Sequence, residues 1–168
     1  RGGYLLRCEG MLEPDGREVQ RIFDSAFQEY GLPATIRSDN GPPFATVGAG
    51  GMTKLSVWWI KLGVFPELIE PGQPQQNGRH ERMHKTLKQE TTKPPAFNAR
   101  AQQRRFNVFR NEFNNQRPHE ALDQEIPASY YSSSQRAMPD RLDPMQYPDR
   151  FEVRYVSANG GIRWHKQW

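Results

Sequence analysis

Residues 71–90 read PGQPQQNGRHERMHKTLKQE. The first eight form a loop rich in proline, glycine and glutamine, and the polar run after them predicts a helix from Arg79 to about Thr91. Glu81 falls in the first turn of this helix, and Lys85 and Lys88 follow it at i+4 and i+7. At these spacings the three charged side chains share one face of the helix.

The chain upstream of this helix alternates between strand and helix. Tyr4–Cys8 is typical of a strand, apolar residues at helical spacing predict a helix over Arg17–Tyr30, and a β-branched pair predicts a short strand that stops at Ser38. Strand, helix, strand is the pattern of an α/β domain. Asp39 follows the second strand, so its carboxylate is expected at the carboxyl edge of the sheet, where such folds build their sites.

Three further elements and an irregular end complete the predicted domain. The apolar pattern indicates a helix over residues 55–62, a short strand over 64–69 and a long helix over 97–115. Proline and serine then dominate, which is linker composition. Alternating residues around Asn159-Gly160 predict a C-terminal β-hairpin, because this dipeptide favours a two-residue turn.

Composition limits the class of protein. The 168 residues suffice for one domain with a core, and 35% are hydrophobic with no apolar run long enough to span a membrane. Nothing at the N-terminus has the pattern of a signal peptide. The single cysteine, Cys8, excludes an intrachain disulfide and suits a reducing cytosol. Since Cys8 lies in a strand-like run, a buried structural thiol is expected rather than a nucleophile.

The positive charge is concentrated in one segment. The whole chain carries a net charge of +4, but residues 79–117 hold ten Lys or Arg against three Glu, a net charge of +7. A concentrated basic segment indicates a phosphate backbone as partner. The alternative is an ordinary solvated helix face.

Asp39 and Glu81 together suggest a metal site. Two carboxylates in one cleft repel each other unless a divalent cation lies between them. Hard oxygen ligands of this kind select Mg²⁺ or Mn²⁺, and paired metals of this type serve phosphodiester chemistry. Lys85 and Lys88 would hold DNA phosphates beside them. Taken singly, Asp39 could be a turn residue and Glu81 an acid that favours the helix dipole, but the lysine spacing favours the joint interpretation.

A competing motif covers the same helix. Residues 80–84 read HERMH and match H-E-x-x-H, the zinc-metalloprotease signature, in which Glu81 would be the base. Five residues with two free positions are a weak signal, and basic residues crowd the position of the metal. No third ligand is evident, because His119 follows another predicted helix and His165 lies in the terminal hairpin.

The segments that carry Asp39 and Glu81 resemble the integrase core (DDE) transposases, in particular the insertion-sequence group related to retroviral integrases. The resemblance covers almost the whole chain. It rests on SDNGPPF at 38–44, PGQPQQNGRHERMHKTLK at 71–88, LSVWW at 55–59, Leu62-Gly63, NNQRPHEAL at 114–122 and PASY at 127–130.

This resemblance implies a fold, a site and partners. It makes Asp39 and Glu81 the second and third acids of the catalytic triad and ligands of Mg²⁺ or Mn²⁺. It implies an RNase H-like fold, a mixed five-stranded sheet with helices on both sides. The partners would be DNA (transposon ends and target) and further copies of the chain, with no membrane, in a prokaryotic cytoplasm and on the nucleoid during activity. The expected DNA-binding residues are Asn77, Arg79, Arg82, Lys85 and Lys88.

The sequence departs from the family pattern at its start. Tyr4–Gly10 looks like the third strand of the fold, so that strands one and two, with the first catalytic Asp, are missing and a sheet edge is expected to be exposed. Neither Asp15 nor Asp24 is placed to substitute. We therefore expect residues 1–130 to be a partial catalytic core, 131–148 a linker and 149–168 the beginning of a small β-rich module.

Two hypotheses follow from this departure. The intact parent would carry out metal-dependent DNA cleavage and strand transfer. The chain alone would be a catalytically inactive remnant that binds DNA or associates with itself, and this is the hypothesis favoured for these 168 residues. An acid-bearing strand encoded upstream of Arg1 would make the chain a fragment of an active enzyme.

Overall fold

The computed structural model describes residues 3–11, 15–47, 51–70, 73, 78–144, 146–157 and 160–162. The predicted helices and strands from the first helix to the long fourth one are found, with ends that differ by one or two residues. In chain order the elements are α1 (Gly16–Tyr30), β1 (Thr35–Ser38), α2 (Lys54–Lys61), β2 (Phe65–Leu68), α3 (Gly78–Thr91), α4 (Ala99–Asn115) and the short 3-10 helices η3 (Glu120–Leu122) and η4 (Pro127–Tyr130).

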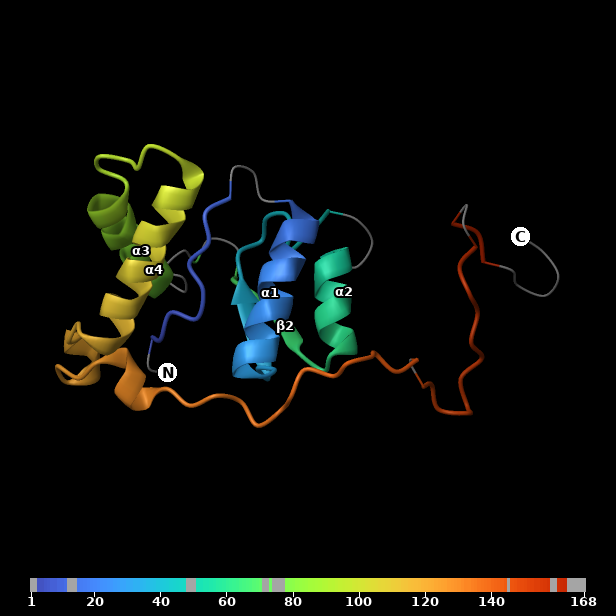
Figure 1. The fold of residues 1–168 in the computed structure, drawn as a ribbon. Coiled ribbons are helices and arrows are strands. Elements are labelled where there is room, and N and C mark those ends of the chain that lie inside the picture. The colour runs from blue at the N-terminus through green and yellow to red at the C-terminus, as the bar shows by residue number, and fades with distance from the viewer. Residues whose placement is uncertain are drawn as a thin grey trace.

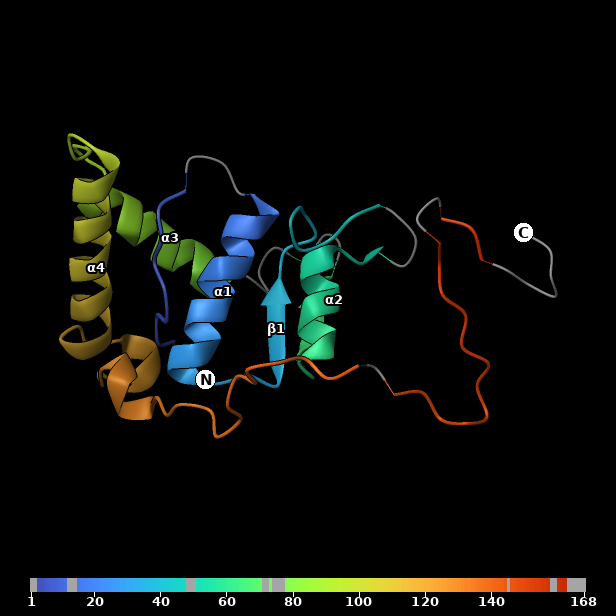
Figure 2. The same ribbon diagram turned by 45° about the vertical axis from the view of Figure 1, so that its right-hand side comes forward.

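The elements form an α/β fold in two groups. β1 and β2 are parallel, with Thr35 opposite Phe65 and Ser38 opposite Leu68. Helices α1 and α2 lie side by side next to these strands, and α3 packs on α4 in a second group (Figure 1). Residues 3–11 run between the two groups, as both views show (Figure 2).

The hydrophobic core lies between α1, α2 and the sheet. Its centre is Trp59, which is fully buried. The indole contacts Phe23 from α1 in an edge-on arrangement with ring centroids 4.9 Å apart, and it stacks on Phe44 at 5.9 Å. Edge-on and offset-stacked rings are the favoured geometries for aromatic pairs. Phe44 belongs to the loop that follows β1, so the core reaches the segment that carries Asp39.

Local sequence explains where these helices begin and end. At the start of α2 the Thr53 side chain accepts a hydrogen bond from the Ser56 backbone while Ser56 Oγ accepts one from the Thr53 backbone, a capping box. After α1 the backbone of Gly31 has a φ of 77°, and a Cβ there would lie 2.5 Å from the Ser134 carbonyl oxygen. Only glycine fits both the backbone conformation and this close approach.

The predicted strand over Tyr4–Cys8 is wrong. These residues are extended, but they pair with no strand among the described residues. The side chain of Asn114 on α4 both accepts from the Leu5 backbone N–H and donates to its carbonyl, at 2.8 and 2.9 Å. The Gln103 side chain likewise donates to the Cys8 carbonyl and accepts a hydrogen bond from the Gly10 N–H. Amide side chains thus satisfy backbone groups that a neighbouring strand would otherwise bind.

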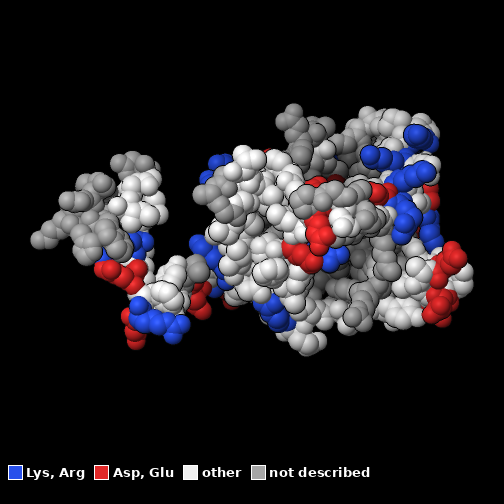
Figure 3. Space-filling view, turned by 180° about the vertical axis from the view of Figure 1, so that it is seen from behind, with Lys and Arg blue, Asp and Glu red and all other residues white. Residues whose placement is uncertain are grey.

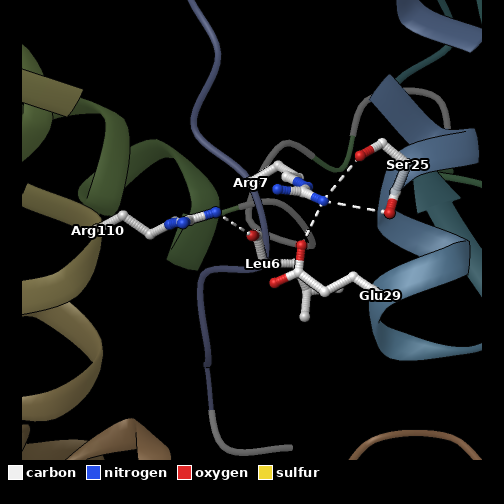
Figure 4. A network of polar contacts seen from close by, with 5 residues as sticks. All are labelled: Leu6, Arg7, Ser25, Glu29 and Arg110. Carbon is white, nitrogen blue, oxygen red and sulfur yellow. Dashed lines mark hydrogen bonds and ion pairs between the residues drawn. The ribbon is translucent and has the colours of Figure 1, made fainter. Parts of the chain in front are cut away.

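Arg7 connects this extended segment to α1. Its guanidinium donates to the Ser25 carbonyl, to Ser25 Oγ and to Glu29 Oε2, the last at 2.5 Å (Figure 4). From the other side, Arg110 on α4 donates to the Leu6 carbonyl at 3.0 Å. Residues 3–11 therefore join the two helix groups by hydrogen bonds rather than as a strand of a sheet.

The mixed sheet expected from the resemblance is reduced in the described residues to two parallel strands. The predicted hairpin is represented there by one antiparallel bridge between Val156 and Ile162, while Asn159 and residues 163–168 lie outside the described part. Part of the predicted linker contacts the core: Arg136 donates to the carbonyls of Pro33, Leu62 and Gly63. The domain boundaries themselves stay a prediction.

Within the described part of the chain, no helix combines the length and the apolar character needed to cross a bilayer.

Candidate functional site

Asp39 lies directly after β1 in a segment that is held on both sides. The Ser38 carbonyl accepts from the Ile69 N–H, and the Asn40 side chain donates to the Ile69 carbonyl at 3.0 Å. Asp39 itself is exposed, and its Oδ1 accepts from the Gly41 N–H at 3.3 Å. The prediction that Asp39 follows a strand is confirmed.

The basic residue nearest to Asp39 in the sequence already forms an ion pair with another acid. Arg37 on β1 forms an ion pair of 2.7 Å with Glu67, its neighbour across the sheet, and this hydrogen bond raises the pKa of Arg37. Asp39 has no cationic partner among the described residues. Its carboxylate is therefore available to a ligand from solution.

Glu81 lies in the first turn of α3, as predicted. Glu81, Lys85 and Lys88 are all exposed, and within the described residues none of the three forms an ion pair. Helix α3 packs on α4, whereas Asp39 belongs to the strand group. Among the described residues no three His, Cys, Asp or Glu side chains are grouped closely enough to hold a metal ion.

Helix α3 is held on α4 by a set of polar contacts that the sequence did not suggest. Arg117 binds Glu90 with both guanidinium nitrogens, at 2.8 and 2.7 Å, and its guanidinium lies 5.4 Å from the centre of the Phe109 ring. The hydrogen bond to Glu90 raises the pKa of Arg117 further above its already high ordinary value. Arg105 donates to the Pro94 carbonyl at 2.6 Å and thereby fixes the turn between the helices.

Replacing Arg117 by alanine is expected to lower the free energy of unfolding by about 1 kcal/mol. The ion pair is one-third exposed and contributes little by itself, but it is bidentate and the cation also lies on an aromatic ring. A double-mutant cycle with Glu90→Ala, measured by urea denaturation, should give a coupling energy of about 0.5–1 kcal/mol. Additive effects of the two substitutions would show that the pair does not hold α3.

These contacts divide the basic residues of the +7 segment into two classes. Arg105, Arg110 and Arg117 are engaged by the protein itself. Seen from behind, blue side chains gather at the end of the molecule where α3 and α4 lie (Figure 3). The described basic side chains of this segment that are exposed and make neither an ion pair nor a hydrogen bond are those of Arg82, Lys85, Lys88, Lys93, Arg100 and Arg104.

A sequence profile for the integrase core domain matches residues 62–127, from the end of α2 to the start of η4. The matched range contains α3 with Glu81 and the whole basic segment. This chain belongs to the integrase core family.

Similar proteins of this family come from bacterial insertion elements and from retroviruses. An uncharacterized 31.7 kDa protein of insertion element IS407 of Burkholderia multivorans is 32% identical over 126 residues, which cover 74% of this chain and 43% of that protein. The Gag-Pol polyprotein of baboon endogenous virus is 35% identical over 75 residues, 45% of this chain and 4% of the polyprotein. The chain thus spans less than half of the length of these relatives.

A solved structure shares the fold. A chain of the simian T-cell lymphotropic virus intasome in complex with PP2A regulatory subunit B56 gamma matches with a TM-score of 0.57 and 18% identity. The match covers 91% of this chain and 55% of that chain. At this identity it supports the arrangement of the elements and nothing about ligands.

Two predicted DNA-binding residues of the integrase core lie beyond what the structure describes. Asn77 is outside the described residues, and of Arg79 only the helical backbone is described. Arg82, Lys85 and Lys88 are exposed on α3. Their role in DNA binding stays a prediction.

The histidines of the HERMH motif lie next to each other on α3. The ring centres of His80 and His84 are 4.3 Å apart, and burial, His80 and Lys88 lower the pKa of His84. His119, which another helix separates from them in the sequence, lines the same cleft of about 520 Å³ as His80. Even so, the described residues contain no third ligand grouped with the pair, which a zinc protease requires.

Cys8 is buried, and burial raises the pKa of its thiol to about 11. A thiol that stays protonated at neutral pH is a poor nucleophile. The expectation of a structural cysteine therefore agrees with its surroundings.

Proposed function

We propose that this chain is the part of a DNA transposase or integrase core that supplies two acidic metal ligands, Asp39 and Glu81, to DNA cleavage and strand transfer. The observation that carries the proposal is the exposure of both carboxylates, Asp39 directly after β1 and Glu81 in the first turn of α3, together with α3 lysines that form no ion pair among the described residues. Membership in the integrase core family supports it.

The chemistry of the donors fits Mg²⁺ or Mn²⁺. Both groups are carboxylates, the hard oxygen ligands that these ions prefer, and neither is neutralised by a cation among the described residues. When bound, paired divalent ions activate the attacking oxygen and stabilise the leaving oxygen in phosphodiester chemistry. We propose Asp39 and Glu81 as the residues that would hold them.

The other residues of the proposed site bind and orient the DNA. Lys85 and Lys88 lie one and two turns after Glu81, so their ammonium groups would hold phosphates next to the carboxylate. The Arg117–Glu90 pair and the Arg105 contact hold α3 on α4, which fixes the direction in which these side chains project. Asn77, Arg79 and Arg82 are proposed as further contacts to the same DNA.

For the 168 residues alone we propose DNA binding without cleavage. The triad of this chemistry needs three acids, and the described residues bring no three potential ligands together. The free cations of α3 need no metal to bind a phosphate backbone. Self-association of the chain, and assembly of the parent with transposon ends and target DNA, belong to the same proposal.

The test is DNA binding by the purified chain over a range of salt concentrations. The double variant Lys85→Ala/Lys88→Ala should lower the slope of log K against log salt by about 1.8, because each phosphate contact contributes about 0.9. The control Lys54→Ala/Lys61→Ala removes two exposed lysines from α2 and should leave the slope unchanged. Equal effects of the two double variants would exclude α3 as the binding helix, and nicking of DNA in Mg²⁺ by this chain would refute the non-catalytic proposal.

A further inference from the structure

We infer that Arg100 and Arg104 on α4 form a second set of phosphate contacts, so that the DNA duplex bound by α3 continues across α4. This inference rests on the proposed DNA binding and extends it to residues that no part of that proposal includes. Three observations carry it: which basic residues are free, where they lie relative to α3, and how they are placed on their helix.

The first observation is that the side chains of these two arginines form no ion pair or hydrogen bond with other described residues. Arg105, the residue after Arg104 on α4, donates to backbone carbonyls at the α3–α4 turn. Arg117 forms an ion pair with Glu90. Arg100 and Arg104 are exposed and have neither an ion pair nor a hydrogen bond from their side chains among the described residues. Because Glu90 is already neutralised by Arg117, it is not available to offset them.

The second observation is their proximity to α3. Arg104 lines one shallow groove of about 510 Å³ together with Glu90 and Thr91, the last residues of α3. Gln102 donates to the Thr91 carbonyl at 3.0 Å, which keeps the first turns of α4 beside the end of α3. Lys88 lies one turn before Thr91. Arg104 therefore lies beside the last turn of α3, and the two helices share the end of the molecule where the blue side chains gather in Figure 3.

The third observation concerns their place on the helix. Arg100 lies in the first turn of α4, which contains no acid. The start of a helix carries partial positive charge, so a cation there is unfavourable for the folded chain. Arg104 follows at i+4 on the same face. An anion bound by these side chains would remove the repulsion, and a phosphate backbone supplies anions at regular intervals to both positions.

The partner that fits is duplex DNA, since one continuous backbone can contact lysines on α3 and arginines on α4 together. Within α4 itself the described residues place no exposed aromatic side chain beside the two arginines for single-stranded bases to stack on, and the exposed ring of Phe97 precedes the helix. We therefore assign Arg100 and Arg104 to backbone contacts that are independent of base sequence.

The experiment compares two double variants of the full chain. Arg100→Ala/Arg104→Ala and Arg17→Ala/Arg21→Ala each remove two exposed arginines at i, i+4, the first pair from α4 and the second from α1, so the change in net charge is the same. With duplex DNA, the α4 variant should lower the salt slope by about 1.8 and weaken binding on the order of tenfold at 0.1 M salt. The α1 variant should leave the slope unchanged.

A thermal melt separates loss of binding from loss of folding. The α4 variant should have an equal or higher Tm than the unchanged chain, because alanine favours helices and the unfavourable cation is gone. Equal slopes for the α4 and α1 variants would overturn the inference. If Lys85→Ala/Lys88→Ala lowers the slope and the α4 variant does not, only the extension to α4 fails, whereas absence of any salt-dependent binding by the unchanged chain would refute both proposals. Unchanged binding to single-stranded DNA and lost binding to the duplex would support the assignment.

Discussion

Replacing Glu81 by glutamine is expected to abolish strand transfer by the parent protein, with a loss of roughly a thousandfold or more. A divalent ion at such a site contributes several kcal/mol to the stabilisation of charge in the transition state, and each 1.36 kcal/mol corresponds to a factor of ten. Glutamine keeps the size and the helical preference of glutamate but not its charge. Strand transfer would be measured with a labelled DNA end in the presence of Mg²⁺ and then of Mn²⁺.

A second readout on the 168 residues separates metal binding from folding. Mn²⁺ binding, followed by titration calorimetry, should weaken on the order of tenfold in the Glu81→Gln variant, because ligand charge sets the affinity of oxygen sites. Glu18→Gln is the matched control, since Glu18 is also an exposed acid in the first turn of a helix, α1. The control should bind Mn²⁺ like the unchanged chain.

Either of two results would contradict the assignment of Glu81. Retained strand transfer in the Glu81→Gln parent would show that another residue holds the metal. Equal Mn²⁺ affinities for the Glu81→Gln and Glu18→Gln variants would show that binding is a general property of surface acids in this chain. A parent that loses strand transfer but keeps Mn²⁺ binding would place Glu81 in another step.

Sequence periodicity predicted the helices well because each has a local cause. The apolar spacing of α1, the capping residues of α2 and the loop before α3 act within a few residues of the helices that they define. The place of Asp39 after a strand and of Glu81 in a first turn could be predicted for the same reason. Both depend on where an element ends, and local residues determine that.

The prediction of a strand at Tyr4–Cys8 was wrong because an extended segment becomes a β-strand only when a neighbouring strand forms hydrogen bonds with it. The local pattern favours extended backbone, and the backbone is indeed extended, but its hydrogen bonds go to Asn114 and Gln103, about a hundred residues away in the sequence. The role of Arg117 was missed for a related reason. Its motif was noticed, but only the folded chain brings Glu90 and Phe109 to it.

Replacing Trp59 by alanine is expected to lower the free energy of unfolding by about 3–5 kcal/mol, a large share of the stability of a domain of this size. Trp59 is fully buried and touches aromatic rings from α1 and from the loop after β1. The loss would be measured by urea denaturation, as a lower midpoint at constant slope. Val57→Ala on the same helix is the control, because Val57 is 37% exposed and its truncation should cost less than about 1 kcal/mol.

A milder variant tests the same packing when Trp59→Ala does not fold. The Nε1 atom of Trp59 is buried and has no hydrogen-bond partner among the described residues. Phenylalanine removes this unsatisfied group and keeps a ring between Phe23 and Phe44, so Trp59→Phe should cost only about 1–2 kcal/mol. A loss as large as that of alanine would show that the indole makes a polar contact.

The stability of Trp59 packing also bears on the proposed metal site. Phe44 stacks on Trp59 and belongs to the loop that begins with Asp39, so a cavity at Trp59 removes the support on one side of that loop. The other side is held by Asn40 and Ile69. Trp59→Phe should therefore leave Mn²⁺ binding intact, whereas Trp59→Ala, under conditions where it remains folded, should weaken it. Equal Mn²⁺ affinities of the two folded variants would show that the contact between Asn40 and Ile69 alone positions Asp39.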